Sequence, residues 1–187
     1  MKFLTLLLLI VMNGCNSIQP RTDKLNLWAR AARLGDIEMI SHLEKNDFND
    51  EDANGLTALM IASRFGQVEM VQYLLSHGAK ADAFDHDKQS SLDYVLYTNL
   101  PEESKRIITQ LLLEKGADPF RPNFLGLAPI YEMVANGFLD EIRHLKFTEK
   151  SACDRLILKS PDGSIVNLAI QNQHTQLAHH LKSMGCP

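Results

Sequence analysis

The residues of this chain best suited to chemistry are its seven histidines and three cysteines. His174, His179 and His180 lie near the carboxyl end, and imidazole is a common metal ligand. On a helix, however, consecutive side chains point about 100° apart, so His179 and His180 would face different directions. We therefore interpret these histidines as solvated polar positions, and we expect neither a metal site nor a cofactor.

The sequence also lacks the short motifs of common catalytic sites. It contains no G-x-S-x-G, H-E-x-x-H or G-x-x-x-x-G-K, which mark nucleophilic serines, zinc proteases and phosphate-binding loops. The three cysteines are too few for a disulfide scaffold and lack the spacing of a structural zinc site. We therefore expect that the protein is not an enzyme.

Composition indicates one folded domain with a short appendage, since the 187 residues are 45% apolar and 22% charged. The formal net charge of -4 lacks the concentrated positive field of a nucleic-acid reader. We therefore expect no nucleic-acid partner, and a chain of this charge is poorly suited to bind an acidic polymer of any kind.

The amino terminus has the pattern of an export signal. Lys2 precedes an apolar run from Phe3 to Met12, and small or polar residues follow the run. A membrane span needs about 20 apolar residues, so this shorter run predicts a signal-peptide core.

Cys15 follows Gly14 directly after this run, and the segment resembles the lipobox at which bacterial lipoproteins are cleaved and lipidated. Met12 and Asn13 depart from the Leu and the Ala or Ser that lipoboxes favour. The alternatives are an ordinary secretory signal with a chance cysteine, or translation that begins at Met12. By the resemblance, Asn16 after the cysteine implies the outer membrane, with the protein facing the periplasm.

These features divide the chain into three parts. We expect a lipoprotein signal peptide over residues 1–14, and a lipidated Cys15 with a polar tether over residues 15–23. The folded domain would then span residues 24–187.

The rest of the chain is an internal repeat. Between Thr57 and Asp82, two short stretches with helical apolar spacing are separated by Gly66 and closed by Gly78. Residues 28–43 repeat this pattern at an offset of about 31. Further copies follow from Asp85 to Asp118, from Asn123 to Leu145 and from Pro161 to Gly185, the last with the character of a terminal cap.

A unit of about 33 residues that carries G-x-T-x-L early and L-L-x-x-G-A late resembles the ankyrin repeat. Residues 55–59 (GLTAL) and 74–79 (LLSHGA) carry the resemblance. It implies an all-α repeat solenoid of about five ankyrin repeats, built from helix-turn-helix units with β-turn or hairpin tips and degenerate terminal caps.

The third repeat departs most from the pattern. Lys88 replaces the turn glycine, and this copy is five residues longer than the second. Its insert lies within Asn99 to Lys105, where Pro101 precedes two acids, as at a helix start. We therefore expect a longer loop between the two helices of this repeat. Met60, Asp93 and Tyr131 stand where ankyrin repeats usually place a histidine.

A disulfide between Cys153 and Cys186 is open. The two could pair in an oxidising periplasm. They lie about one repeat apart, however, where stacking usually separates backbones by more than a disulfide spans.

Ankyrin stacks bind partners through the turn tips and the exposed face of the first helices, so the resemblance implies a protein-binding surface there. Aromatic residues and Arg are favoured at the centres of interfaces. The residues expected to bind a partner are Arg64, Phe65, Phe84, His86, Asp87, Tyr97, Phe124 and Leu125. Alternatively, the aromatic ones pack on the next repeat. We expect a monomer before complex formation.

Small ankyrin-repeat lipoproteins resemble immunity proteins of bacterial type VI secretion systems, which neutralise a cognate phospholipase effector in the periplasm. The resemblance implies that this chain binds such a lipase and that the lipid anchor keeps it beside the attacked membrane. An acidic inhibitor would also suit a basic enzyme. The alternatives are a periplasmic scaffold that supports catalase or oxidative-stress defence, and a host-directed effector, which a lipid anchor disfavours.

Overall fold

The computed structural model describes residues 19–42, 48–143, 145, 165–183 and 186. Over these residues it contains ten α-helices and no strand. The only β-type pairing among the described residues is an isolated antiparallel bridge between Phe84 and Ser90. The helices are α2 (Gln19–Leu34), α3 (Ile37–Ser41), α4 (Ala58–Arg64), α5 (Val68–Ser76), α6 (Ser91–Leu96), α7 (Glu102–Glu114), α8 (Pro129–Ala135), α9 (Leu139–Arg143), α11 (Ile165–Gln171) and α12 (Thr175–Ser183).

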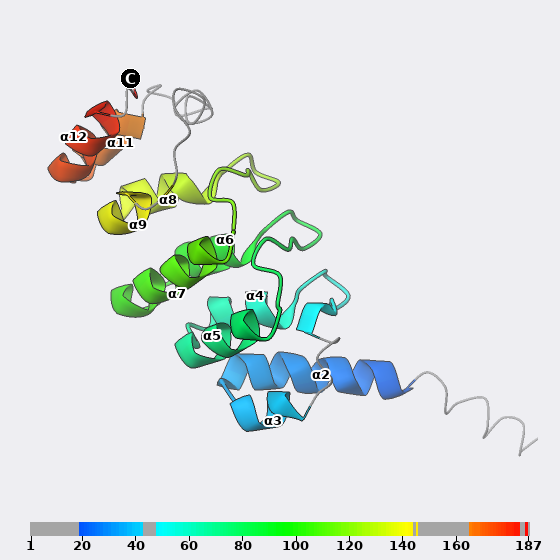
Figure 1. The fold of residues 1–187 in the computed structure, drawn as a ribbon. Helices are drawn as coiled ribbons and strands as arrows, with labels where there is room; N and C mark the ends of the chain where they lie inside the picture. The colour runs from blue at the N-terminus through cyan, green and yellow to red at the C-terminus, as the bar shows by residue number, and fades with distance from the viewer. Residues whose placement is uncertain (1–18, 43–47, 144, 146–164, 184–185, 187) are drawn as a thin grey trace, which may run out of the picture.

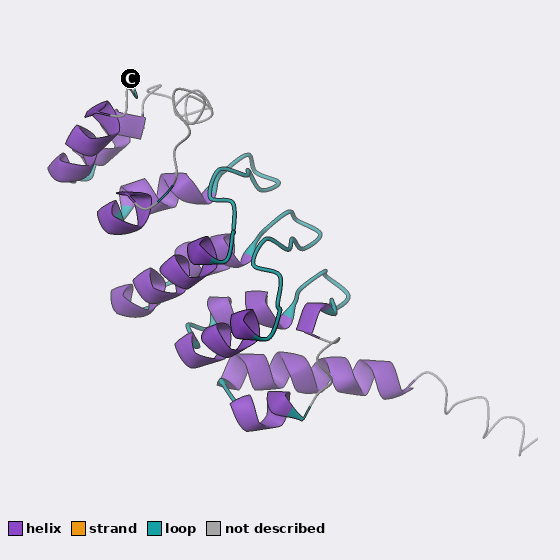
Figure 2. Ribbon diagram, in the orientation of Figure 1, coloured by secondary structure: helices purple, strands orange, loops and turns teal. Residues whose placement is uncertain are grey.

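These helices form five consecutive pairs that stack in chain order, from α2–α3 to α11–α12 (Figure 1). The first helices pack on one another, because α4 contacts both α2 and α6, and α8 contacts both α6 and α11. The second helices form the other layer, in which α7 contacts α5 and α9. Long loops project from one side of the stack before α4, α6 and α8 (Figure 2). The expected all-α repeat solenoid is confirmed.

The second pair shows how the sequence sets each unit. Thr57 caps α4 by accepting a hydrogen bond from the Met60 backbone N–H. Gly66 has φ of +69° in the turn between the helices, and Gly78 has φ of +95° after α5. Only glycine adopts these left-handed conformations at little cost. The helix boundaries predicted from the two glycines are therefore confirmed.

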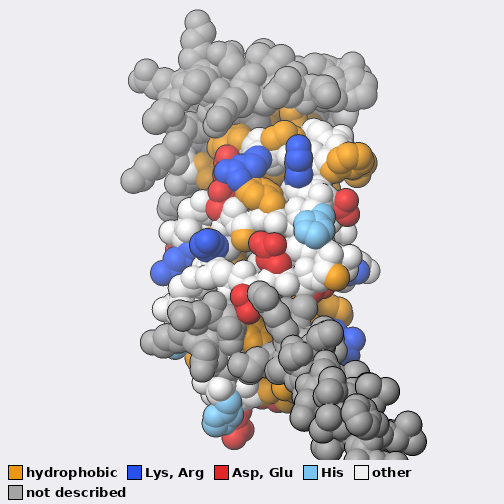
Figure 3. All heavy atoms as spheres, turned by 90° about the vertical axis from the view of Figure 1, so that its right-hand side faces the viewer, with side chains coloured by type: hydrophobic (Ala, Val, Ile, Leu, Met, Phe, Trp, Pro, Cys, Tyr) orange, Lys and Arg blue, Asp and Glu red, His pale blue; other side chains and the backbone are white. Residues whose placement is uncertain are grey.

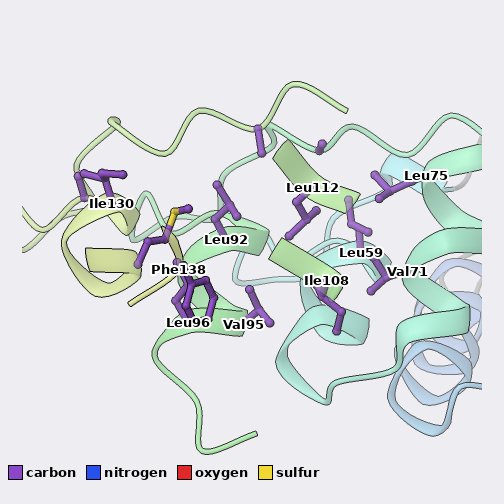
Figure 4. Close-up of a cluster of buried hydrophobic side chains, with 14 of the residues drawn as sticks. Leu59, Val71, Leu75, Leu92, Val95, Leu96, Ile108, Leu112, Ile130 and Phe138 are labelled. Atoms are coloured by element: carbon purple, nitrogen blue, oxygen red, sulfur yellow. The ribbon is translucent and has the colours of Figure 1, made fainter. Parts of the chain in front are cut away.

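The core runs the length of the stack. Leu59, Leu92 and Ile130 occupy the same place in three successive first helices, and all are buried. Figure 4 shows them with side chains from the second helices, including Val71 and Ile108, in one continuous apolar layer. Each pair therefore buries its apolar faces only with its neighbours in place.

The expanded third repeat has a longer turn and a longer second helix. The turn between α6 and α7 is longer, as predicted, but most of the expansion lengthens a helix: α7 has 13 residues, whereas α5 has nine. Pro101 is the N-cap residue, and Glu102 and Glu103 fill the first turn, where the helix dipole favours acids. The longer turn and the helix start at Pro101 are therefore confirmed, and the extra length of α7 is an addition that the sequence did not predict.

The first helix begins earlier than expected. α2 starts at Gln19 and so includes residues 19–23, which we predicted to belong to the tether. Cys15 and the expected signal peptide lie outside the described residues. No helix in the described part of the chain is long and apolar enough to cross a bilayer.

The carboxyl-terminal pair corrects one further expectation. His174 is not simply solvated, because its Nε2 atom lies 2.9 Å from the Ala135 carbonyl oxygen at the end of α8. It therefore joins the last pair to the preceding one. Cys186 is buried and takes part in a disulfide. Cys153 lies outside the described residues, so its pairing with Cys186 stays a prediction.

Candidate protein-binding surface

The three loop tips share one local structure. The side-chain oxygen of the first tip residue accepts two backbone N–H bonds, from the residues two and four positions later, at 2.8–3.1 Å. The accepting residues are Asp52, Asp85 and Asn123. Such turns fix a loop locally, without a strand or a large core. The chain therefore presents three tips of nearly the same shape.

Backbone hydrogen bonds join successive tips. The N–H of His86 donates to the Asn54 carbonyl at 3.0 Å, and the N–H of Phe124 donates to the Asp87 carbonyl at 3.0 Å. Lys88 takes φ of +58°, as Gly55 and Gly126 do with positive φ in the other tips. The replacement of the turn glycine by Lys88 therefore keeps the turn but strains it.

The third tip carries the most exposed apolar residues. Phe124 is 74% exposed and Leu125 is 71% exposed. Phe84, directly before the second tip, is half-buried, and the Arg121 guanidinium lies 4.2 Å from its ring centre. Figure 3 faces the loops and shows hydrophobic side chains beside basic ones toward the carboxyl-terminal repeats. Exposed apolar groups of this size, next to cations, are typical of interaction surfaces.

A groove lies on the first helices near the amino-terminal end of the stack. It has a volume of about 390 Å³ and lies between α2, α4 and α6. We call it the arginine groove, and its main side chains are Arg30, Arg33, Ile61, Arg64, Phe65 and Tyr94. The three arginines and Phe65 are exposed, so they are available to a partner.

Aromatic rings position two of these arginines. The guanidinium carbon of Arg33 lies 6.0 Å from the ring centre of Phe65, and that of Arg64 lies 5.9 Å from the ring centre of Tyr94. Both distances are at the outer limit for cation–π attraction. The rings therefore add only a weak attraction for these two guanidinium groups, which line the groove.

Tyr94 is itself fixed by the second tip, because its hydroxyl donates a hydrogen bond to Asp85 Oδ2. Burial, followed by this hydrogen bond to a carboxylate, raises the pKa of the Tyr94 hydroxyl far above its usual value of 10.0. The phenol therefore stays neutral at physiological pH and acts as a hydrogen-bond donor.

Tyr97 follows α6 and is 42% exposed. Desolvation, with the charge of Asp93 next in size, raises the pKa of its hydroxyl to about 12. Asp93 is buried and accepts hydrogen bonds from the Ser90 N–H and hydroxyl at 2.8 and 2.7 Å and from the Asn123 side chain at 3.3 Å. Burial is the main cause that raises the pKa of the Asp93 carboxyl.

The structure divides the expected binding residues into two groups. Arg64 and Phe65 line the arginine groove. The other expected residues, apart from Tyr97, lie in the linked second and third tips or, for Phe84, directly before the second tip; those in the tips are His86, Asp87, Phe124 and Leu125. Phe65, Tyr97 and Phe124 are exposed, so the alternative that they form core is not what the fold shows.

Arg30, Arg33, Ile61 and Tyr94 line the groove but are not among the binding residues expected from the sequence. Tyr94 precedes the expected Tyr97 by three residues, Ile61 precedes the expected Phe65 by four, and Arg30 precedes Arg33 by three. Residues three and four apart share one helix face, so this spacing could have identified them. In the part of the chain that the structure describes, no three His, Cys, Asp or Glu side chains are grouped to hold a metal ion.

Comparison with known proteins agrees with this geometry. A family model for three copies of the ankyrin repeat matches residues 3–85 and 27–123. The chain is 31% identical over 122 residues to "Ankyrin repeat, SAM and basic leucine zipper domain-containing protein 1" of Carollia perspicillata. It is 34% identical over 99 residues to the protein of that name from Mustela putorius furo.

The matches cover 64% and 52% of this chain, but only 26% and 21% of the two relatives. The chain thus spans about a quarter of their length, and the similarity concerns the repeats and not the whole relatives. With its stacked helix pairs, its linked tips and the match to the repeat model, the chain belongs to the ankyrin-repeat family.

Proposed function

We propose that this chain is a lipid-anchored immunity protein that binds a secreted phospholipase in the periplasm and blocks its activity. Ankyrin repeats are protein-interaction modules, so the general role of the chain is that of a protein-binding scaffold. The single observation that carries the proposal is the set of exposed aromatic and arginine side chains on the first helices and the exposed apolar side chains of the third tip. The sequence of residues 1–15 supports the choice of compartment.

The surface suits a protein inhibitor for physical reasons. Phe65 and Phe124 expose 46% and 74% of their area. A protein partner is large enough to bury both rings, and burial of aromatic rings contributes strongly to the binding free energy. The tips are fixed by their own hydrogen bonds, so little loop entropy is lost on binding. An anchor on Cys15 would keep this surface near the membrane that a phospholipase attacks.

The test is capture of the partner from the native cell envelope. The full chain, tagged at its carboxyl end so that Cys15 is untouched, is compared with a double variant, Phe65→Ala with Phe124→Ala. Gln72→Ala is the control, because Gln72 is exposed on α5, away from the groove and the tips. We expect that the wild type and the control capture a phospholipase, that the double variant loses it, and that the purified chain inhibits its lipid hydrolysis.

Capture of the same non-toxic envelope protein by the wild type and the double variant would refute both the immunity role and the choice of surface. A captured phospholipase whose hydrolysis continues at full rate in the complex would refute neutralisation alone.

A further inference from the structure

We propose that the arginine groove binds an acidic segment of the partner, with carboxylates held by Arg33 and Arg64 and an apolar side chain between them. The proposal rests on the proposed function, since it names the kind of segment that this surface recognises. It differs from what the net charge of -4 favours, which is a basic partner.

The three arginines of the groove carry charges that no ion pair in the described part of the chain balances. Within the described residues, the ion pairs of arginine involve Arg106, Arg121 and Arg143, and no carboxylate lies within ion-pair distance of Arg30, Arg33 or Arg64. Three cations that line one groove repel one another, and an anion bound among them would relieve the repulsion.

The acidic residue next to the groove, Asp85, is engaged in hydrogen bonds of the second tip. Asp85 Oδ2 accepts the Tyr94 hydroxyl, and Asp85 Oδ1 accepts the backbone N–H groups of Asp87 and Gln89. Asp85 is also buried. This carboxylate therefore holds the tip and forms no ion pair with Arg64.

The shape of the groove suits a short protein segment. A hollow of about 390 Å³ falls within the range of about 300–1,000 Å³ that is typical of ligand pockets, and it accommodates one or two side chains. Leu56 and Ile61 line it together with the arginines, so it offers apolar contacts as well as charge. A flat lipid headgroup layer cannot follow such a hollow, whereas one extended or helical segment can.

The guanidinium groups of the groove are suited to bind carboxylates. Arginine donates two parallel N–H bonds to a carboxylate, which gives geometry as well as attraction. The guanidinium carbons of Arg33 and Arg64 lie 6.0 and 5.9 Å from the ring centres of Phe65 and Tyr94, so the rings add a weak attraction that favours positions beside the groove.

The experiment uses fluorescein-labelled peptides of nine residues, with four Glu residues around a central Phe, and the same peptide with Gln or with Lys in place of Glu. Their binding to the full chain is measured by fluorescence anisotropy at low salt. We expect the Glu peptide to bind about tenfold more tightly than the Gln peptide, and the Lys peptide to bind less tightly than either.

The decisive variant is Arg33→Gln with Arg64→Gln, which should weaken the Glu peptide about tenfold. Lys80→Gln with Lys115→Gln is the matched control, because it makes the same change in net charge at exposed cations outside the groove. This control should leave the affinity unchanged. Far-ultraviolet circular dichroism checks that both variants are folded.

Equal affinities for the Glu and Gln peptides, or equal losses in the groove and control variants, would overturn the proposal. So would binding to phosphatidylglycerol vesicles that depends on Arg33 and Arg64 while the Glu peptide does not bind. Because the titration needs no captured protein, it can fail while a phospholipase is captured, and it can succeed when none is.

Discussion

At the scale of single residues, Asp93 is the most unusual group in the fold. It stands where ankyrin repeats usually place a histidine, and its carboxyl is buried between Ser90 of its own repeat and Asn123 of the next tip. It completes the cap of α6 together with Ser90. Its hydrogen bonds therefore stabilise the junction of two repeats, while its charge is costly to bury.

This cost gives a prediction about pH. Burial raises the pKa of Asp93 in the folded state above 3.8, so the folded protein holds this proton more tightly than the unfolded chain does. The contribution of Asp93 to stability is therefore greatest at acidic pH and falls as the pH rises from about 3.8 through the raised pKa. We expect that Asp93→Asn, which has no charge, gains stability relative to the wild type between about pH 4 and pH 7.

Urea unfolding of the two proteins at several pH values measures this difference. Ser90→Ala serves as the second variant, because the Ser90 hydrogen bonds lower the pKa of Asp93 and their partial loss should make the pH dependence steeper. A stability difference between Asp93→Asn and wild type that does not change with pH would show that the buried carboxyl is not responsible.

At the scale of helices, α7 and α9 illustrate how an irregular repeat is accommodated. Glu141 in α9 occupies the place that Met70 and Ile108 take in the two preceding repeats, yet it is only 8% exposed. Arg106 in α7 compensates for this buried charge with a salt bridge at 3.2 Å. The same guanidinium lies 4.4 Å from the ring centre of Phe138.

We therefore expect Arg106→Ala to destabilise the fold by about 1–3 kcal/mol, because it leaves Glu141 without its partner. Glu102→Ala removes only the exposed partner of Arg106, and its cost should be below about 0.5 kcal/mol. Thermal unfolding of both variants makes the comparison. Equal costs would mean that the Arg106–Glu141 pair does not support the fourth repeat.

The helices also show what the sequence can and cannot predict. Thr57, Gly66 and Gly78 act within one or two turns of chain, so the boundaries of α4 and α5 follow from their types. The start of α7 also follows from local residue types, since Pro101 precedes Glu102 and Glu103, but its length of 13 residues was not predicted.

The arginine groove was only half predicted, since it depends on how three helices stack. Arg64 and Phe65 follow from their place in one repeat, but Arg30 and Tyr94 come from the two neighbouring repeats. Their approach is set by the packing of α4 on α2 and α6, which no spacing within one helix defines. The link from His174 to Ala135 was missed for the same reason.

At the scale of the whole molecule, charge and tether set how the scaffold meets a partner. The net charge of -4 would favour a basic partner at long range, whereas the arginine groove favours a carboxylate at contact. These act over different distances, so one partner can satisfy both if a basic protein presents an acidic segment.

The anchor is tested by Cys15→Ser. If Cys15 carries the lipid, the variant should move from the membrane fraction to the soluble fraction of the producing cells, because acyl chains and no spanning helix would hold the protein there. Cys153→Ser is the control and should stay with the membranes. Membrane association that is unchanged in Cys15→Ser would exclude lipidation of this residue as the anchor.

The most direct test of the central claim, that one face of the repeat stack binds the partner, is site-specific photo-crosslinking in living cells. A photoreactive phenylalanine is placed at Phe65 in the groove, at Phe124 in the third tip, or at Gln72 on the opposite layer. We expect one and the same protein, a phospholipase, to be crosslinked from the first two positions and not from Gln72. Equal crosslinking from all three positions, or crosslinking from Gln72 alone, would contradict the account.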